Sequence, residues 1–408
     1  MRPDKVQRLT SEELRTNIYY FGFTDYETKP ISYNYPMHML LPTIDYDFSY
    51  PLMIYLWFGS IIPLEEMMHT DVDYINEKGL HIYLYEPMST YNDSGVPKSR
   101  ELDSILIYAS NNNITNITVH TCEYKCDEIF SYYTKHMKLL NDDLFLRSTI
   151  IEHTTMDMNN FTKKFINLNS RFALHRVLTA AYLANRSGYC SWNYKVNIDT
   201  LKTIFIDIDN LDKTVEGRLV QGLNYLNQYA PLIVDTPVDR VVNVDNLDNV
   251  GNPKYAVRMN SMVEKYYADV FCAIETESIY LSPAANLSEK TLRAIAHRKP
   301  FIVVGAMHSL KYLRSMGYKT FSDFWDENYD DEPDYTLRMA KIFKLIDYID
   351  SMSMDQLHDL YDRMQPILEH NNKLLYELQP SKEKFKRLTN VNSKLKQALW
   401  VNHNRYYD

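Results

Sequence analysis

The sequence predicts an α/β protein with two Rossmann-like lobes and C-terminal helices, and three observations support this class. Short apolar runs alternate with amphipathic helical segments, which is the pattern of parallel sheets joined by right-handed crossovers. A polar stretch without period, Glu152–Phe161, interrupts that alternation once. The chain has 408 residues, more than one ordinary domain holds. We therefore expect lobes at residues 1–155 and 160–345, with helices and a basic tail at 346–408.

The first lobe is predicted from apolar strands separated by loops and helices. A helix is expected at Glu101–Asn111, because its apolar side chains share one face. A loop is expected at Tyr91–Pro97, which is rich in Asn, Asp, Ser, Gly and Pro. The other expected elements are strands at Pro51–Gly59, Leu80–Tyr85 and Ile117–Thr121 and a short helix near Asp127–Tyr133.

The second lobe repeats a strand–helix–strand pattern, and two long helices follow it. The tail Lys382–Lys396 holds six cations and one Glu, which suits either contact with a polyanion or a solvated amphipathic helix. The expected strands are Lys164–Leu168, Ile204–Asp207, Val270–Ile274 and Phe301–Val304; the expected helices are Phe172–Asn185, Arg258–Tyr267, Ser288–His297, Thr336–Ser351 and Met354–Leu378.

Composition places the chain among ordinary globular proteins, with 45% hydrophobic and 24% charged residues. No apolar run is long enough to span a bilayer, and the N-terminus lacks a signal peptide's apolar segment, so we expect a cytoplasmic protein without a membrane partner. The net charge of −9 argues against a uniformly basic nucleic-acid coat protein but allows a local basic cleft. The cysteines lack the spacing of a zinc site and are interpreted as reduced thiols: Cys122, Cys126, Cys190 and Cys272.

The strongest candidate site is an anion-binding helix start. With only 10 glycines, the chain has no G-x-G-x-x-G or Walker loop, so a phosphate site must use a helix N-terminus and cationic side chains. Ser288 is a predicted N-cap, Lys290 lies in the first turn, and Arg293 follows one turn later. Glu289 can accept hydrogen bonds from vicinal hydroxyls. The other interpretation is a capped surface helix with solvated charges.

These residues also resemble a known family. Ser-Glu-Lys-x-x-Arg, followed by a helix and a strand from Pro300 to Gly305, is similar to the donor-binding segment of the α1,3-fucosyltransferases, the family-10 glycosyltransferases. That family has Thr-Glu-Lys in the segment and, upstream, a strand ending in Phe-x-x-x-Glu-Asn. Here Phe271 and Glu275 match, Thr276 replaces the Asn, and the intervening loop is longer, so the donor sugar does not follow. The resemblance covers about Phe271–Gly305 and implies a two-lobed GT-B architecture, with Glu275 and Glu289 orienting the donor.

A second resemblance covers more of the chain and carries less chemistry. Four segments look like uncharacterised glycosyltransferases of tailed phages: Leu310–Gly317, Thr320–Tyr329, Thr115–Tyr124 and Asn141–Phe145. This resemblance implies work in the host cytoplasm on double-stranded DNA with hydroxymethylated bases. The fucosyltransferase resemblance instead implies a glycan acceptor, and both acceptors stay open.

A second phosphate-binding candidate is the turn Asn169, Ser170 and Arg171, which joins a strand to a helix. Arg171 could clamp a diphosphate through two hydrogen bonds. The alternative is that Asn169 caps the helix and the arginine lies on the surface. His175 is interpreted as a packed or solvated residue.

The remaining candidates are carboxylates. Glu86 ends a strand before Pro87 and is the proposed general base for the acceptor hydroxyl, with Asp45 and Asp47 as rivals. Asp207-Ile208-Asp209 has the spacing of a metal-binding pair, but such spacing arises by chance in an Asp-rich chain. We therefore expect no metal site.

Together these observations predict transfer of a sugar from a nucleotide-diphosphate sugar, with no cofactor besides that donor. Arg171 and Lys290 would stabilise the departing diphosphate, and Glu86 would activate the acceptor. The competing hypothesis is a non-catalytic binding protein that has a glycosyltransferase fold.

Overall fold

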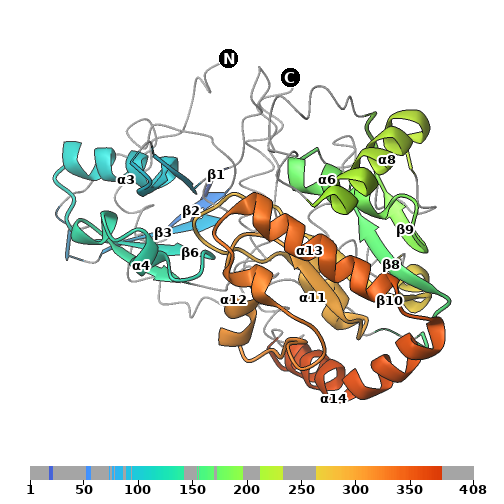
Figure 1. Ribbon diagram of the computed structural model, residues 1–408. Helices are drawn as coiled ribbons and strands as arrows, with labels where there is room; N and C mark the ends of the chain where they lie inside the picture. The colour runs from blue at the N-terminus through green and yellow to red at the C-terminus, as the bar shows by residue number, and fades with distance from the viewer. Residues whose placement is uncertain are drawn as a thin grey trace, which may run out of the picture. The chain divides into compact units, whose positions relative to one another are not determined.

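The computed structural model describes residues 18–21, 52–56, 73, 76–77, 79–85, 89–92, 94–141, 154, 156–169, 172–195, 212–232 and 263–378. The chain divides into two compact units, whose described residues lie within 18–141 and 154–378. Each unit contains a parallel sheet with helices (Figure 1), so the predicted α/β class is confirmed. The lobe boundaries and the GT-B arrangement stay predictions.

The sheet of the first unit has five parallel strands in the order of the chain. Helix α3, Arg100–Asn111, begins after Ser99, whose hydroxyl accepts a hydrogen bond from the Leu102 N–H, and it buries Leu102, Ile105 and Ala109. The strands are β1 Ile18–Phe21, β2 Leu52–Leu56, β3 Leu80–Tyr85, β6 Ile117–Thr121 and β7 Lys138–Asn141; the short helices α4 Cys126–Ile129 and η4 Tyr133–Lys135 precede β7.

A small hairpin stands where a loop is expected. Its strands are β4 Ser89–Tyr91 and β5 Pro97–Ser99, so Tyr91 and Pro97 are strand ends and the loop itself is shorter. Asn92 shapes that loop by accepting hydrogen bonds from the Ser94 and Val96 N–H groups at 3.0 and 2.8 Å. Strands of three residues are too short to show an alternating pattern, which is why the sequence does not reveal them.

The sheet of the second unit has four parallel strands in the order β11-β10-β8-β9. They are β8 Lys163–Leu168, β9 Gly188–Ser191, β10 Val270–Thr276 and β11 Phe301–Val304. From β8 the chain moves outward to β9 and then returns to the other side of β8, so the strand order reverses between β8 and β10. Such a reversal is a topological switch point, and in α/β proteins ligands bind outside the carboxyl ends of the strands there.

Helices complete the second unit. All residues of β10 and β11 are buried, and α14 packs against α11 and β10. Helices α6 and α8 approach closely at Gly222, where a Cβ would clash with the Ala181 carbonyl oxygen. The absence of a side chain at Gly222 allows this contact. The helices are α6 Leu174–Leu183, α8 Lys213–Tyr229, α11 Glu289–Ala296, α12 Ser309–Ser315, α13 Tyr335–Asp350 and α14 Met354–Leu378, with the 3₁₀ helix η8 Asn328–Asp331. None of the helices in the described ranges has the length and apolarity needed to cross a membrane.

Candidate functional site

The predicted donor-binding segments meet at the carboxyl edge of the second sheet. Asn169 directly follows β8, Glu275 lies near the end of β10, and Ser288 begins α11, the helix that connects β10 to β11. Because β8 and β10 are neighbours at the switch point, segments about 100 residues apart in the chain come together. This edge is therefore the candidate site.

Asn169 connects three strands at this edge. Its side chain accepts a hydrogen bond from Thr276 Oγ1 and donates one to Asn167 Oδ1, both at 2.5 Å, and its N–H donates to Ser191 Oγ at 2.9 Å. It is 2% exposed, so its amide holds strand ends together. The N-cap of α6 is Ala173, which corrects the alternative that Asn169 caps this helix. Thr276, which stands where the fucosyltransferases have Asn, supplies one of these bonds.

Ser288 is the N-cap of α11, as predicted, and Lys290 folds back over the first turn. Ser288 Oγ accepts a hydrogen bond from the Lys290 N–H at 3.4 Å. Lys290 Nζ lies 3.0 Å from that hydroxyl and 3.2 Å from Glu289 Oε1, and its side chain is 15% exposed. The helix start thus holds a cation that is already paired with a carboxylate.

Glu289 is ionised at this helix start. Partial burial works to raise its pKa, but the charges of Lys290 and Arg293 outweigh this and hold the pKa of Glu289 at about 2. Its side chain is 44% exposed. An exposed acceptor with a fixed negative charge suits a hydroxylated ligand.

Glu277 makes hydrogen bonds to several elements at this edge, and it was not among the predicted site residues. Its carboxylate accepts hydrogen bonds from the hydroxyls of Ser288 and Thr291, in the first turn of α11. Its carbonyl oxygen accepts from His175 Nε2 at 2.8 Å and from Arg176 Nη2 at 3.2 Å. Its N–H donates to the Val304 carbonyl oxygen at 3.0 Å, at the end of β11.

The side chain and backbone of Glu277 therefore link the end of β10 with α11, α6 and β11. Glu277 is fully buried, and burying a carboxylate is costly unless hydrogen bonds satisfy it. The signal in the sequence is the alternation Glu275-Thr276-Glu277, because residues two apart on a strand share a face. Glu277 bonds the start of α11, Glu275 bonds Tyr267, and Thr276 bonds Asn169 on the opposite side, just after β8.

Glu275 and Arg293 face the protein interior. Glu275 is 3% exposed, its Oε1 accepts a hydrogen bond from the Tyr267 hydroxyl at 2.6 Å, and burial raises the pKa of this carboxyl to about 7. Arg293 is 6% exposed, with its guanidinium 6.0 Å from the Tyr267 ring centre. His297 stacks on the same ring at 4.5 Å. These buried side chains support α11 from beneath.

His175 is a packed residue, in line with its interpretation from the sequence. Its ring lies 5.3 Å from the Tyr280 ring. Burial lowers the pKa of His175 to about 3, so the ring is neutral. Its Nε2 therefore carries the proton that is donated to the Glu277 carbonyl oxygen.

Several predicted residues lie outside the described part of the chain. These are Glu86 with its rivals Asp45 and Asp47, the turn residues Ser170 and Arg171, the pair Asp207 and Asp209, and the tail Lys382–Lys396. The four cysteines form no disulfide. Within the described ranges, no three His, Cys, Asp or Glu side chains are grouped so that they could hold a metal ion.

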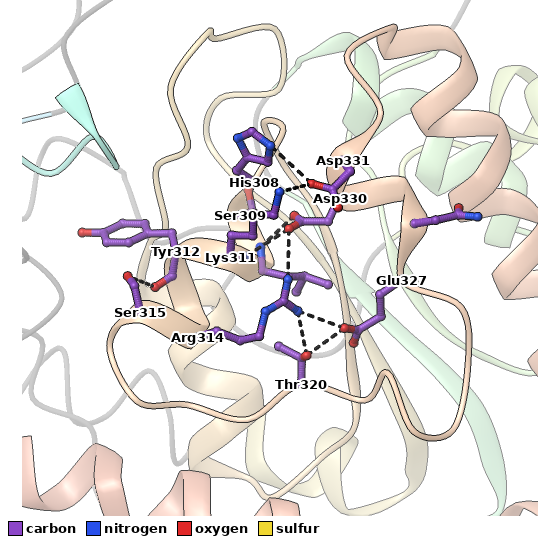
Figure 2. A network of polar contacts seen from close by, with 12 residues as sticks. His308, Ser309, Lys311, Tyr312, Arg314, Ser315, Thr320, Glu327, Asp330 and Asp331 are labelled. Carbon is purple, nitrogen blue, oxygen red and sulfur yellow. Dashed lines mark hydrogen bonds and ion pairs between the residues drawn. The ribbon is translucent and has the colours of Figure 1, made fainter. Parts of the chain in front are cut away.

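A second polar network lies beyond β11 (Figure 2). The Asp330 carboxylate accepts hydrogen bonds from the Leu310 and Lys311 N–H groups at 2.8 and 3.0 Å and so caps α12. Arg314 donates to Thr320 at 2.9 Å and to Glu327 at 3.1 Å. These bonds join α12 to the segment Thr320–Asp331 that follows it, which indicates that these residues stabilise the local fold.

Comparison with protein-family models, with curated proteins and with solved structures finds no match for this chain.

Proposed function

We propose that the protein is a nucleotide-sugar-dependent glycosyltransferase of the two-lobed GT-B type, with its donor bound at the carboxyl edge of β8 and β10. The observation that carries the proposal is the start of α11 with Lys290 at the topological switch point. A helix N-terminus attracts anions, and the crevice at a switch point is where α/β proteins bind nucleotides.

The chemistry follows from the charges at α11. Lys290 Nζ already lies at the helix start, 3.0 Å from Ser288 Oγ and 3.2 Å from Glu289 Oε1. From there it would exchange Glu289 for oxygens of the diphosphate. Glu289, ionised at its pKa of about 2, would then accept hydrogen bonds from ribose or sugar hydroxyls. A cation beside the departing diphosphate stabilises the charge that develops there, which is electrostatic catalysis.

Other residues would act in support. Glu277 would fix the first turn of α11 through Ser288 and Thr291. Arg293 and Glu275 would hold the helix from beneath. Arg171 as a second diphosphate ligand, and Glu86 as the base that activates the acceptor, complete the proposal from the sequence. The acceptor is a hydroxymethylated base of double-stranded DNA or a glycan.

One observation favours the alternative of a non-catalytic binding protein with this fold. Four residues expected to bind the donor, Asn169, Glu275, Ser288 and Arg293, are at most 6% exposed. The site would then hold its ligand mainly through Lys290 and Glu289. A binding protein without a reactive geometry needs no more than that.

A thermal-shift screen against a panel of nucleotide sugars tests the proposal, since a ligand that binds the folded state raises the melting temperature. We expect a hit whose shift is lost in Lys290→Ala, together with loss of sugar transfer. Lys373→Ala is the matched control, because Lys373 is an exposed lysine of α14 that pairs with Glu377. Binding without transfer to either acceptor class would favour the binding protein, and no shift with any nucleotide sugar would reject both.

Chelation tests the metal-independent mechanism separately. We expect transfer to continue in excess EDTA, because Lys290 supplies the cation. Loss of activity that magnesium or manganese restores would instead promote Asp207 and Asp209 to metal ligands.

A further inference from the structure

Three aromatic side chains gather at the same carboxyl edge, and we call them the aromatic platform: Phe172, Trp192 and Tyr194. Phe172 precedes the N-cap of α6, and Trp192 and Tyr194 follow the end of β9. The ring centre of Phe172 lies 5.9 Å from those of both Trp192 and Tyr194, which are themselves 5.5 Å apart. The contacts are tilted or edge-to-face, the arrangements that aromatic rings prefer.

The platform has a fixed base and two exposed rings. Trp192 is fully buried, and its indole N–H donates to the Tyr194 carbonyl oxygen at 2.7 Å. Its backbone exchanges hydrogen bonds with Leu232 at 3.0 and 2.7 Å. Phe172 and Tyr194, by contrast, are 55% and 40% exposed. A rigid support that presents two large rings to solvent is typical of a binding surface.

The position of the platform relates it to the switch point. Strand β9 lies beside β8, and β8 lies beside β10. Two strand spacings separate β9 from β10, about 10 Å. Asn169 links these strand ends, because it bonds both Ser191, next to Trp192, and Thr276 of β10. A nucleotide can bridge that distance, with its base at one end and its phosphates at the other.

We propose that the aromatic platform binds the base of the donor nucleotide, whose phosphates reach the start of α11. This inference rests on the proposed function and adds the nucleoside subsite to it. Bases stack on aromatic faces, and such contacts tolerate any base because each has a π-face. Because the indole N–H of Trp192 is already used, the platform offers a ligand mainly the faces of its two exposed rings, which suits a planar base. The platform is therefore a subsite for a planar base.

The test measures binding of UDP, GDP, ADP and TDP, with glucose 1-phosphate as a probe that lacks a base, by isothermal titration calorimetry. The variant is Phe172→Leu with Tyr194→Leu, which keeps an apolar surface but removes both rings. We expect the tightest-binding nucleoside diphosphate to lose about tenfold or more in affinity, from the contribution of base–aromatic stacking. Binding of glucose 1-phosphate should not change.

The control is Tyr229→Leu, because Tyr229 is 52% exposed and forms an aromatic pair with Tyr225, on α8. It should bind every probe as the wild type does, and circular dichroism checks that each variant is folded. The inference is overturned if the double variant binds nucleoside diphosphates with unchanged affinity, or if no nucleoside diphosphate binds the wild type. Binding of a single-stranded oligonucleotide in place of every mononucleotide would also overturn it.

The two proposals can fail separately. If Lys290→Ala abolishes transfer and the platform variant leaves nucleotide affinity unchanged, the glycosyltransferase stands and the base subsite lies elsewhere. If the platform variant weakens nucleotide binding and no sugar is transferred, the nucleoside subsite stands and the enzyme proposal fails.

Discussion

Among the described residues, the larger sheets of the two units are both parallel, but the one in the second unit alone reverses its strand order. In the first unit the strands follow the chain from β1 to β7, whereas in the second the order turns back between β8 and β10. Connections that leave a reversal go to opposite faces of the sheet and open a crevice at its carboxyl edge. A ligand site formed by the fold itself is therefore expected in the second unit.

The sheets differ in a second respect, the number of buried acids at their strand ends. Strand β10 ends beside two buried acids, Glu275 and Glu277, which are 3% and 0% exposed. Strand β6 of the first unit buries only hydroxyls, at Thr118 and Thr121, and one buried acid follows it, Glu123, which is 1% exposed. Buried carboxylates cost stability unless they are well bonded. The second unit carries that cost at the edge where the candidate site lies.

Removing the Glu277 carboxylate should have the largest effect. Glu277→Ala leaves the hydroxyls of Ser288 and Thr291 without their acceptor in a fully buried place. We expect the free energy of unfolding of the second unit to fall by about 4 kcal/mol, because two hydrogen bonds to the carboxylate are lost. Urea unfolding followed with probes in each unit measures this, since the two units need not unfold together.

Glu128→Ala is the control in the first unit. Glu128 pairs with Lys125 on the surface, with a side chain that is 64% exposed, and exposed ion pairs contribute little. If both variants change the urea midpoint equally, the contrast between the two units is wrong. Glu277→Gln keeps the shape of the side chain and removes its charge, so if it behaves like Glu277→Ala, the charge of the carboxylate matters more than its shape.

The next largest effect is a pH dependence set by Glu275. Burial raises the pKa of this carboxyl to about 7, above its ordinary 4.5, so the folded state binds the extra proton between these values. Stability from this group is complete below pH 4.5 and is lost as pH rises through 7, by about 3 kcal/mol in total. Glu275→Gln stays neutral, so the difference in unfolding free energy between variant and wild type should change with pH across that window. A difference that stays constant from pH 4.5 to 8 would show that Glu275 is ionised in the folded state throughout.

His297 should give a slope of opposite sign. Burial lowers the pKa of His297 to about 3 from 6.5. Between these pH values the imidazole is protonated in the unfolded state and neutral in the folded state. Stability is complete above pH 6.5 and falls by about 2 kcal/mol by pH 5. Neither ring nitrogen has a hydrogen-bond partner in the described ranges, so His297→Phe should fold well and remove this loss. Thermal melts of both proteins between pH 5 and 7.5 measure it, and parallel pH profiles would contradict the burial argument.

The elements that the sequence predicts best are those with a strong period. Strand β6 and helix α14 have the predicted bounds, Ile117–Thr121 and Met354–Leu378. Helix α8 is missed because two glycines, Gly217 and Gly222, interrupt its pattern, although Gly222 is what allows its close contact with α6. Strand β9 is missed because its four residues, three half-buried and one buried, show no alternation.

The candidate site is less predictable than the fold. The sequence indicates the cap and charges of α11, because these depend on neighbours in the chain. The role of Glu277 depends on partners 11 and 14 residues away, and the aromatic platform joins residues that are 20 and 22 positions apart. Such groupings require the strand order, which local patterns do not contain. The direction of Arg293 also depends on Tyr267, from the segment before β10.

The smallest effect compares two N-caps, Ser99 of α3 and Ser288 of α11. Each accepts a backbone N–H bond at its helix start, and losing such a cap costs about 1 kcal/mol. Both hydroxyls also donate to a buried acid, Ser99 to Glu101 and Ser288 to Glu277, but Ser288 lies in addition 3.0 Å from Lys290 Nζ. We therefore expect both substitutions to lower stability by similar amounts, and Ser288→Ala also to weaken nucleotide binding severalfold. Equal stability losses with unchanged nucleotide affinity would mean that the start of α11 is an ordinary cap, and that the reversal of strand order does not by itself create a ligand site.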